Sequence, residues 1–176
     1  MRDLMMSITA LLAGASFAGP AAALQTSTVA VATSAGPCAS AEHHQFDFWI
    51  GRWDVYDTKG KMVAHSLIEP VYGCGIRENW MPLSNQPGGS LSIYVPDEKR
   101  WEQFWIDSSG SRAIFTGGWS GSAMVITGKW GGPLVRMSYS KNADGSVRQF
   151  GEQSTDDGKH WSTSFDFIYR PARGGQ

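Results

Sequence analysis

The sequence predicts an all-β fold, a single antiparallel up-and-down β-barrel of about ten strands. The chain of 176 residues includes 21 Gly and eight Trp but is only 18% charged, a composition typical of β-structure with many tight turns. From Phe46 onward, short strand-like runs alternate with turn signals, and we find no convincing amphipathic helix there. The length suits one domain of ordinary size, alone or with a tail.

The predicted strands follow one another at close spacing. They lie at Trp53–Thr58, Val63–Glu69, Gly75–Met81, Leu91–Val95, Arg100–Asp107, Ala113–Thr116, Ala123–Lys129, Leu134–Ser140, Ser146–Gln153 and Trp161–Tyr169. Their short connections carry the Gly, Asn, Asp or Pro that a tight reversal needs. Such connections join antiparallel strands, because a parallel crossover takes a dozen or more residues. A meander of this length closes into a barrel, which removes exposed edges. A β-sandwich is the alternative.

Side-chain alternation defines two faces on each strand without showing which face is inside. In the fifth predicted strand, one face carries Trp101, Gln103 and Trp105, while the other carries Phe104 and Ile106. Neither face is purely polar. We therefore expect this strand to separate a lined interior from an outside that is also partly covered.

The amino-terminal residues predict export. Arg2 precedes an apolar stretch that is too short, and too rich in Ala and Gly, for a good membrane span. Pro20 and the small residues Ala21-Ala22-Ala23 follow, as in a cleaved secretory signal. The mature protein is expected in the periplasm or outside the cell. The predicted organisation is a signal peptide at 1–23, a flexible leader at 24–45, the barrel domain at 46–171 and a tail at 172–176.

The chain contains two cysteines, Cys38 and Cys74. In an exported protein, two cysteines form a disulfide more often than a metal site or a nucleophile. The bond would join the leader to the domain, and the chain-entropy model assigns about 3–4 kcal/mol to a loop of this length. The alternative is two unpaired thiols.

The segment Phe46-Asp47-Phe48-Trp49-Ile50-Gly51-Arg52-Trp53 resembles the opening of a bacterial family of exported, lipocalin-like domains of unknown function. Further segments match that family in order, and together they span nearly all of residues 46–170. These segments are Gly73-Cys74, Glu78-x-Trp80, Trp101-x-Gln103-x-Trp105-x-Asp107 and Val147-Arg148 leading into Ser154-x-Asp156-x-Gly158-x-x-Trp161. The resemblance implies a lipocalin-like barrel and no particular activity.

Two smaller resemblances concern structural residues. Gly51-x-Trp53 resembles the calycin signature, which implies that Trp53 closes one end of the barrel and that Arg170 packs across it. A cation over an indole contributes about 0.5–2 kcal/mol, depending on burial. The run from Ser154 to Trp161 resembles an Asp-box turn, which implies structural roles for four residues: Ser154, Asp156, Gly158 and Trp161.

Composition and spacing exclude several kinds of site. A formal charge of −1 without a basic run argues against nucleic-acid binding. The histidines do not have zinc-site spacing, so we predict no metal and no cofactor; haem held by His65 or His160 is the alternative. Gly-x-Ser-x-Gly is missing from the sequence. We interpret Gly88-Gly89, Gly117-Gly118 and Gly131-Gly132 as turns rather than phosphate loops.

Glu78 is the candidate for chemistry. It shares a strand face with Ile76 and Trp80, and burial would raise its pKa unless Arg136 or Arg148 compensated its charge. An enclosed Glu–Arg pair beside aromatic side chains could orient a ligand or act as a general base. The alternative is a structural ion pair or an outward-facing strand. The predicted ligand-binding residues are Glu78, Trp80, Gln103, Trp105 and Arg136.

Three functions are open at this point. The first is a barrel that binds a small hydrophobic or aromatic ligand without turnover. The second is a lyase, isomerase or decarboxylase that uses Glu78 in the same cavity, and the third is a ligand-free structural protein of the envelope. An apolar, open interior would favour binding, a Glu–Arg pair facing a void would favour catalysis, and side-chain filling would favour a structural role. The sequence leaves the oligomeric state open.

Overall fold

The computed structural model describes residues 36–84 and 86–172. Ten strands follow one another along the chain: β1 (Gly51–Asp57), β2 (Met62–Val71), β3 (Gly75–Pro82), β4 (Gly88–Val95), β5 (Arg100–Asp107), β6 (Arg112–Trp119), β7 (Met124–Lys129), β8 (Leu134–Lys141), β9 (Val147–Ser154) and β10 (Ser162–Pro171). Three short 3-10 helices accompany them: η1 (Ala41–His44), η2 (Asp47–Trp49) and η3 (Pro96–Glu98). The predicted signal peptide, most of the leader and residues 173–176 of the tail lie outside the described residues.

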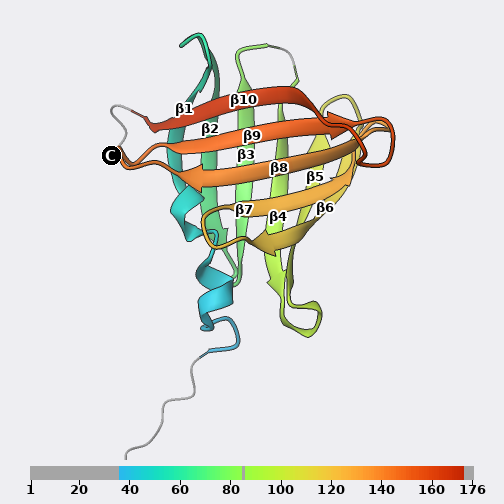
Figure 1. Ribbon diagram of the computed structural model, residues 1–176. Helices are drawn as coiled ribbons and strands as arrows, with labels where there is room; N and C mark the ends of the chain where they lie inside the picture. The colour runs from blue at the N-terminus through green and yellow to red at the C-terminus, as the bar shows by residue number, and fades with distance from the viewer. Residues whose placement is uncertain (1–35, 85, 173–176) are drawn as a thin grey trace, which may run out of the picture. The chain divides into compact units, whose positions relative to one another are not determined.

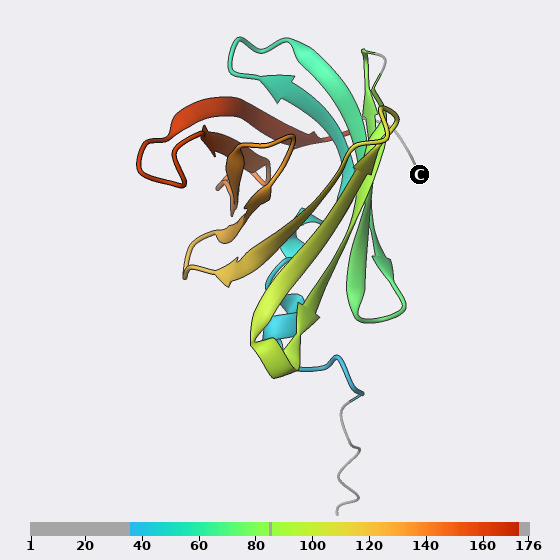
Figure 2. The same cartoon turned by 90° about the vertical axis from the view of Figure 1, so that its right-hand side faces the viewer.

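The strands form one closed antiparallel barrel. Each strand pairs with its neighbours in sequence, and β1 pairs with β10 to close the ring, as in the register of Val55 with Tyr169. Figure 1 shows β7–β10 crossing over β2–β5 at a steep angle, and Figure 2 shows the same barrel from the side. The prediction of an all-β, up-and-down barrel of ten strands is confirmed.

Two of the three glycine pairs are strand residues, so their interpretation as turns was wrong. Gly88-Gly89 opens β4 and Gly117-Gly118 lies within β6, whereas Gly131-Gly132 forms a turn with positive φ angles of 63° and 114°. A Cβ atom on Gly117 would lie 2.0 Å from the carbonyl oxygen of Val125 on β7. Here glycine permits a close approach of two backbones rather than a reversal.

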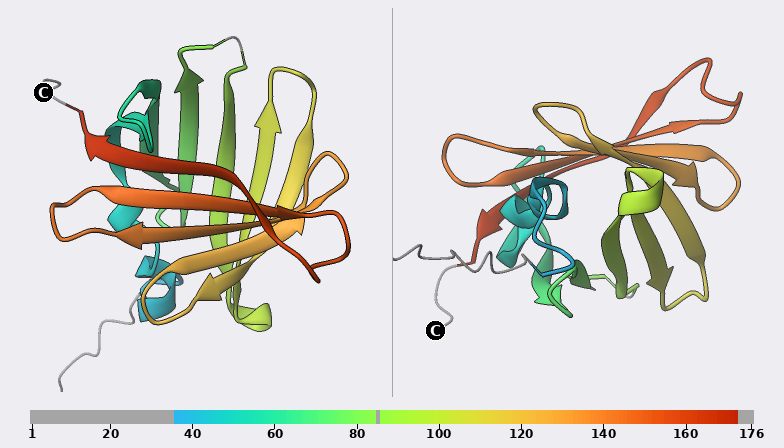
Figure 3. Two further views of the ribbon diagram at one scale, coloured as in Figure 1. Left: turned by 45° about the horizontal axis from the view of Figure 1, so that its top comes forward. Right: turned by 90° about the horizontal axis from the view of Figure 1, so that it is seen from below.

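Aromatic residues close one end of the barrel. Phe46 stacks on Trp49 with ring centroids 5.0 Å apart, and its ring meets the edges of Trp101 and Tyr139. The indole of Trp53 donates a hydrogen bond to the carbonyl oxygen of Trp49 at 2.9 Å. Both 3-10 helices η1 and η2 lie at this end, as the two views of Figure 3 show. We call the cluster of Phe46, Trp49, Trp53, Trp101 and Tyr139 the plug.

The leader is attached to the barrel where the structure describes it. A disulfide joins Cys38 to Cys74 in the turn between β2 and β3, which confirms the predicted bond. The ring of His43 packs edge-on against Tyr94, and Gln45 accepts a hydrogen bond from the Trp101 indole at 3.3 Å. The chain therefore enters the plug under covalent and packing constraints.

The structure corrects the expected stack of Arg170 on Trp53. Arg170 pairs in register with Asp54, so it shares the outer face of the barrel with that residue, while Trp53 points inward and is 6% exposed. The guanidinium of Arg170 lies 5.0 Å from the centre of the Tyr56 ring instead. Neighbouring positions along a strand point to opposite faces, which separates the two side chains.

The β4 strand carries polar residues inside and apolar residues outside. Ser90 and Ser92 are buried, whereas Leu91 and Ile93 are 50% and 45% exposed. The next strand, β5, likewise exposes Phe104. The sequence predicted that the outer face of β5 would be partly covered, but Phe104 and Ile106 on that face are exposed in the described structure.

None of the helices in residues 36–84 and 86–172 is long and apolar enough to cross a membrane.

Candidate functional site

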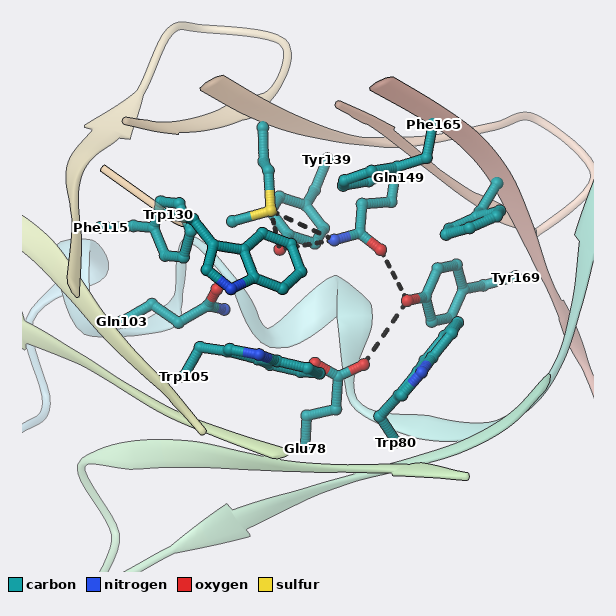
Figure 4. Close-up of a pocket in the computed structure, with 12 residues that line it drawn as sticks. Glu78, Trp80, Gln103, Trp105, Phe115, Trp130, Tyr139, Gln149, Phe165 and Tyr169 are labelled. Atoms are coloured by element: carbon teal, nitrogen blue, oxygen red, sulfur yellow. Dashed lines mark hydrogen bonds between the residues drawn. The ribbon is translucent and has the colours of Figure 1, made fainter. Parts of the chain in front are cut away.

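A cavity of about 220 Å³ lies inside the barrel. Its floor is made of seven deeply buried side chains, of which Glu78, Gln103 and Gln149 are polar, and its mouth of half-buried aromatic rings. Figure 4 shows these side chains converging from different strands on one central space. The lining residues are Glu78, Trp80, Gln103, Trp105, Phe115, Trp130, Met137, Tyr139, Gln149, Phe165, Phe167 and Tyr169.

Strand alternation places the predicted residues in this cavity. Glu78 and Trp80 are two apart on β3, and Gln103 and Trp105 are two apart on β5, so each pair shares an inward face. All four line the cavity. The sequence did not determine which face of either strand is inside, and the structure now supplies that information.

Among the residues that the structure describes, Glu78 is a buried carboxylate without a cationic partner. It is 6% exposed and accepts hydrogen bonds from Ser66 on β2 at 3.0 Å and from Ser90 on β4 at 3.4 Å. Burial removes the carboxylate from water and raises the pKa of Glu78 from 4.5 to about 7, although the hydrogen bonds oppose this shift. Near neutral pH the side chain therefore populates both of its charge states.

A chain of hydrogen bonds leads from Glu78 across the floor. The hydroxyl of Tyr169 lies 3.5 Å from a Glu78 oxygen and donates to the Gln149 carbonyl oxygen at 2.6 Å. The Gln149 amide then donates to the hydroxyl of Tyr139 at 2.9 Å. Burial and the nearby Glu78 charge raise the pKa values of both tyrosines, which keeps their phenols neutral. The dashed lines in Figure 4 mark this network.

Two indoles at the mouth are held by hydrogen bonds to the β5–β6 hairpin. Trp105 donates its N–H to Asp107 at 3.3 Å, and Trp130 donates its N–H to Ser111 at 2.9 Å. The two rings meet edge to face with centroids 5.9 Å apart. Because their polar N–H groups are already bonded to the hairpin, the indoles can offer their apolar surfaces to the cavity.

The structure corrects the placement of Arg136 and Arg148 beside Glu78. Arg136 bonds to Glu152 at 2.8 Å and covers the Trp161 ring, while Arg148 forms a bidentate pair with Asp166. Inward residues flank each arginine in sequence, so alternation turns the arginine itself outward. Among the residues lining the cavity in the described structure there is no Lys or Arg, and the predicted Glu–Arg pair does not form.

The histidines lie away from the cavity. His65 pairs with Asp54 at 2.8 Å and is exposed, and His160 pairs with Asp156 on the turn before β10. Neither residue lines the cavity, so the alternative of haem held there by His65 or His160 is not supported by geometry. Residues 36–84 and 86–172 also contain no cluster of three or more His, Cys, Asp or Glu that could hold a metal ion.

The Asp-box-like segment forms a hydrogen-bonded turn. The Ser154 hydroxyl donates to Asp156 at 2.7 Å and accepts from the Gly158 N–H at 2.9 Å. Gly158 has a φ of 87°, and its carbonyl oxygen accepts the Trp161 indole N–H at 3.0 Å. These contacts join residues of the turn to one another.

Sequence reasoning did not predict two thirds of the lining. One readable signal was present in Phe165, Phe167 and Tyr169, which are aromatic at every second position of β10 and therefore share a face. Trp130 lies in the loop between β7 and β8, where strand alternation gives no information. The other residues that line the cavity come from β6, β8 and β9 and are Phe115, Met137, Tyr139 and Gln149.

Fold and site define this protein as a closed ten-stranded β-barrel with an internal, aromatic-lined cavity around one buried carboxyl group. No protein-family model and no curated protein matches the chain.

Proposed function

We propose that this protein is an exported, lipocalin-like barrel that binds a small hydrophobic or aromatic molecule in its internal cavity. The observation that carries the proposal is the cavity of about 220 Å³, walled by the indoles of Trp80, Trp105 and Trp130. Ligand sites are concave and mostly apolar, with a few polar groups that fix orientation. The Glu78 carboxyl and the Gln103 amide supply such groups here.

The state of the interior favours binding over the other two functions. An interior filled by side chains would leave no cavity of this size, so the volume argues against a purely structural role. A Glu–Arg pair facing the cavity would favour catalysis, but Arg136 and Arg148 pair with acids on the outer face. Ligand binding is the function consistent with both the open cavity and the outward position of the two arginines.

Export and kinship with the lipocalin-like family belong to the same proposal. The amino-terminal signal and the disulfide between Cys38 and Cys74 support export, because disulfides persist in oxidising compartments. Gly51-x-Trp53 supports the kinship, since Trp53 lies in the plug and a Cβ on Gly51 would approach its indole to 3.0 Å. Protein recovered from the periplasm should have the intact mass of a chain that begins near Leu24.

The binding test uses the emission of the wall indoles. Aromatic and aliphatic compounds are titrated into the wild type and into Trp80→Phe, Trp105→Phe and Trp161→Phe, with melting temperature as a second readout. We expect ligand-dependent fluorescence changes to shrink in the first two variants and to persist in the third, because Trp161 packs on the Asp-box turn. A broad panel that changes neither emission nor melting temperature would contradict the proposal, and native mass spectrometry provides an unbiased search for a retained molecule.

One observation favours a second candidate, an enzyme that uses Glu78 as an acid or base. The pKa of Glu78 is about 7, where proton transfer at neutral pH is most effective. Glu78→Gln separates the two functions, because an enzyme variant would retain affinity for its substrate and lose turnover.

A further inference from the structure

We infer that the cavity selects organic cations, meaning an aromatic or compact apolar molecule with an ammonium group that lies against Glu78. This inference rests on the proposed function and specifies its ligand class. It depends on the charge balance of the cavity, on the aromatic rings around the carboxyl and on the cavity volume.

The charge balance comes first. Of the twelve residues that line the cavity in the described structure, Glu78 alone is acidic and none is basic. The groups facing its carboxyl from β2, β4 and β10 are Ser66, Ser90 and Tyr169, all of them uncharged. On β3 itself, the neighbouring Arg77 points outward and pairs with Glu69. An ionised Glu78 thus leaves an uncompensated negative charge that a ligand can neutralise.

The aromatic rings come second. Figure 4 shows the Glu78 carboxyl between the indoles of Trp80 and Trp105. Trp80 in turn stacks on Phe167 at 5.8 Å, which fixes it beside β10. The face of an indole carries a partial negative charge, so an ammonium group that lies over the face of either tryptophan is attracted to it. A carboxylate bordered by indoles combines two attractions for a cation.

The volume comes third. Apolar cavities of about 150 Å³ accept benzene. A cavity of about 220 Å³ therefore has room for one aromatic ring and a short substituent. The buried floor carries the polar groups of Glu78, Gln103 and Gln149, and the half-buried mouth is entirely aromatic, so a cation with an apolar body matches the difference between floor and mouth. A ligand carboxylate at the floor would meet the like charge of Glu78.

The test compares two molecules of the same shape. Phenyltrimethylammonium carries a permanent positive charge, and tert-butylbenzene replaces its nitrogen with carbon. We expect the wild type at pH 8 to bind the cation about tenfold or more tightly than the neutral probe by calorimetry or fluorescence titration. Benzoate, an anion of similar size, should bind more weakly than either.

Two variants locate the effect. Glu78→Gln keeps the shape of the side chain and should reduce the affinity for the cation about tenfold or more, with little change for tert-butylbenzene. Glu152→Gln removes a carboxylate on the outer face, where Glu152 pairs with Arg136, and should preserve the preference for the cation. If both variants lose the preference equally, general surface charge explains it and the inference is wrong.

The wild type provides a second test that requires no substitution. Lowering the pH from 8 to 5 protonates Glu78, whose pKa is about 7, and should weaken binding of phenyltrimethylammonium but not of tert-butylbenzene. Equal affinity of the two probes at pH 8, or tighter binding of benzoate, would overturn the cation inference while leaving the proposed binding function in place. If neither aromatic probe nor the broad panel binds, the proposed function itself fails.

Discussion

The hydroxyl of Tyr169 on β10 reaches across the interior to within 3.5 Å of the Glu78 carboxyl on β3. Its single hydrogen is donated to Gln149 at the shorter distance of 2.6 Å. A protonated Glu78 can therefore donate to the Tyr169 oxygen, which couples the charge state of the carboxyl to contacts between opposite walls of the barrel.

The burial of Glu78 predicts a pH-dependent stability, because it raises the pKa of this carboxyl group. The folded state raises the pKa of Glu78 from 4.5 to about 7, so between these values the folded protein holds a proton that the unfolded chain has lost. The contribution to the free energy of unfolding is complete below pH 4.5 and decreases as the pH rises through 7. Relative to Glu78→Gln, the wild type should lose on the order of 3 kcal/mol of stability from pH 4.5 to pH 8. Urea denaturation of both proteins measures this difference, and parallel pH profiles would contradict it.

Gly151 on β9 supports the ring of Phe165 at the mouth of the cavity. A Cβ atom there would lie 2.4 Å from that ring, so Gly151→Ala should destabilise the fold by about 1–3 kcal/mol and alter ligand binding. Gly118 on β6 is the matched control, because a Cβ added to it has open space around it. Gly118→Ala should change the free energy of unfolding by less than about 0.5 kcal/mol. Equal effects of the two substitutions would show that the contact with Phe165 is unimportant.

The disulfide predicts a large difference between the oxidised and reduced proteins. Cys38 and Cys74 are 36 positions apart, and closing such a loop lowers the entropy of the unfolded chain. This loss raises the free energy of unfolding by about 3–4 kcal/mol. The variant with both cysteines changed to Ser should lose about this much free energy of unfolding and should no longer respond to reductant. A wild type that is equally stable with and without reductant would refute the prediction.

The surface position of Arg170 predicts where double-mutant cycles find coupling. Its guanidinium covers the Tyr56 ring, so Arg170→Ala and Tyr56→Leu should couple by about 0.5–1 kcal/mol. Arg170→Ala and Trp53→Leu should couple by less than about 0.3 kcal/mol, because the two side chains lie on opposite faces. If Arg170 instead coupled more strongly to Trp53 than to Tyr56, the stack of Arg170 on Trp53 expected from the sequence would be correct.

The sequence was sufficient for the number and order of the strands, because most hairpins have local turn chemistry that requires no knowledge of the rest of the fold. It did not show that β4 and β6 extend through Gly88-Gly89 and Gly117-Gly118. The sequence was insufficient to show which face of each strand points into the barrel. On β4 the serines point inward because Ser90 donates to Glu78 and Ser92 accepts from Gln103, and both partners lie on other strands. Hydrophobicity alone would place Leu91 inside, although it is 50% exposed. The face of a strand depends on such partners across the sheet.

The candidate site was predictable to a similar depth. Glu78, Trp80, Gln103 and Trp105 were found because two short motifs alternate polar and aromatic residues on one face. Arg136 was expected beside Glu78, but its sequence neighbours Val135 and Met137 are buried, and alternation along the strand therefore turns Arg136 to the outer face. The contribution of β10 depends on closure of the barrel, since pairing with β1 brings Tyr169 on β10 close to Glu78 on β3.

The bond between Cys38 and Cys74 also determines how the barrel bears mechanical load. Tension applied to the chain before Cys38 passes through the sulfur atoms to the turn between β2 and β3, and bypasses both the plug and β1. The segment from 38 to 74 is a covalent ring, so a pull from the amino-terminal side cannot peel β1 away from β10 by unzipping. In the reduced protein the same pull acts on the leader and then on the plug, so rupture would begin where His43 packs on Tyr94.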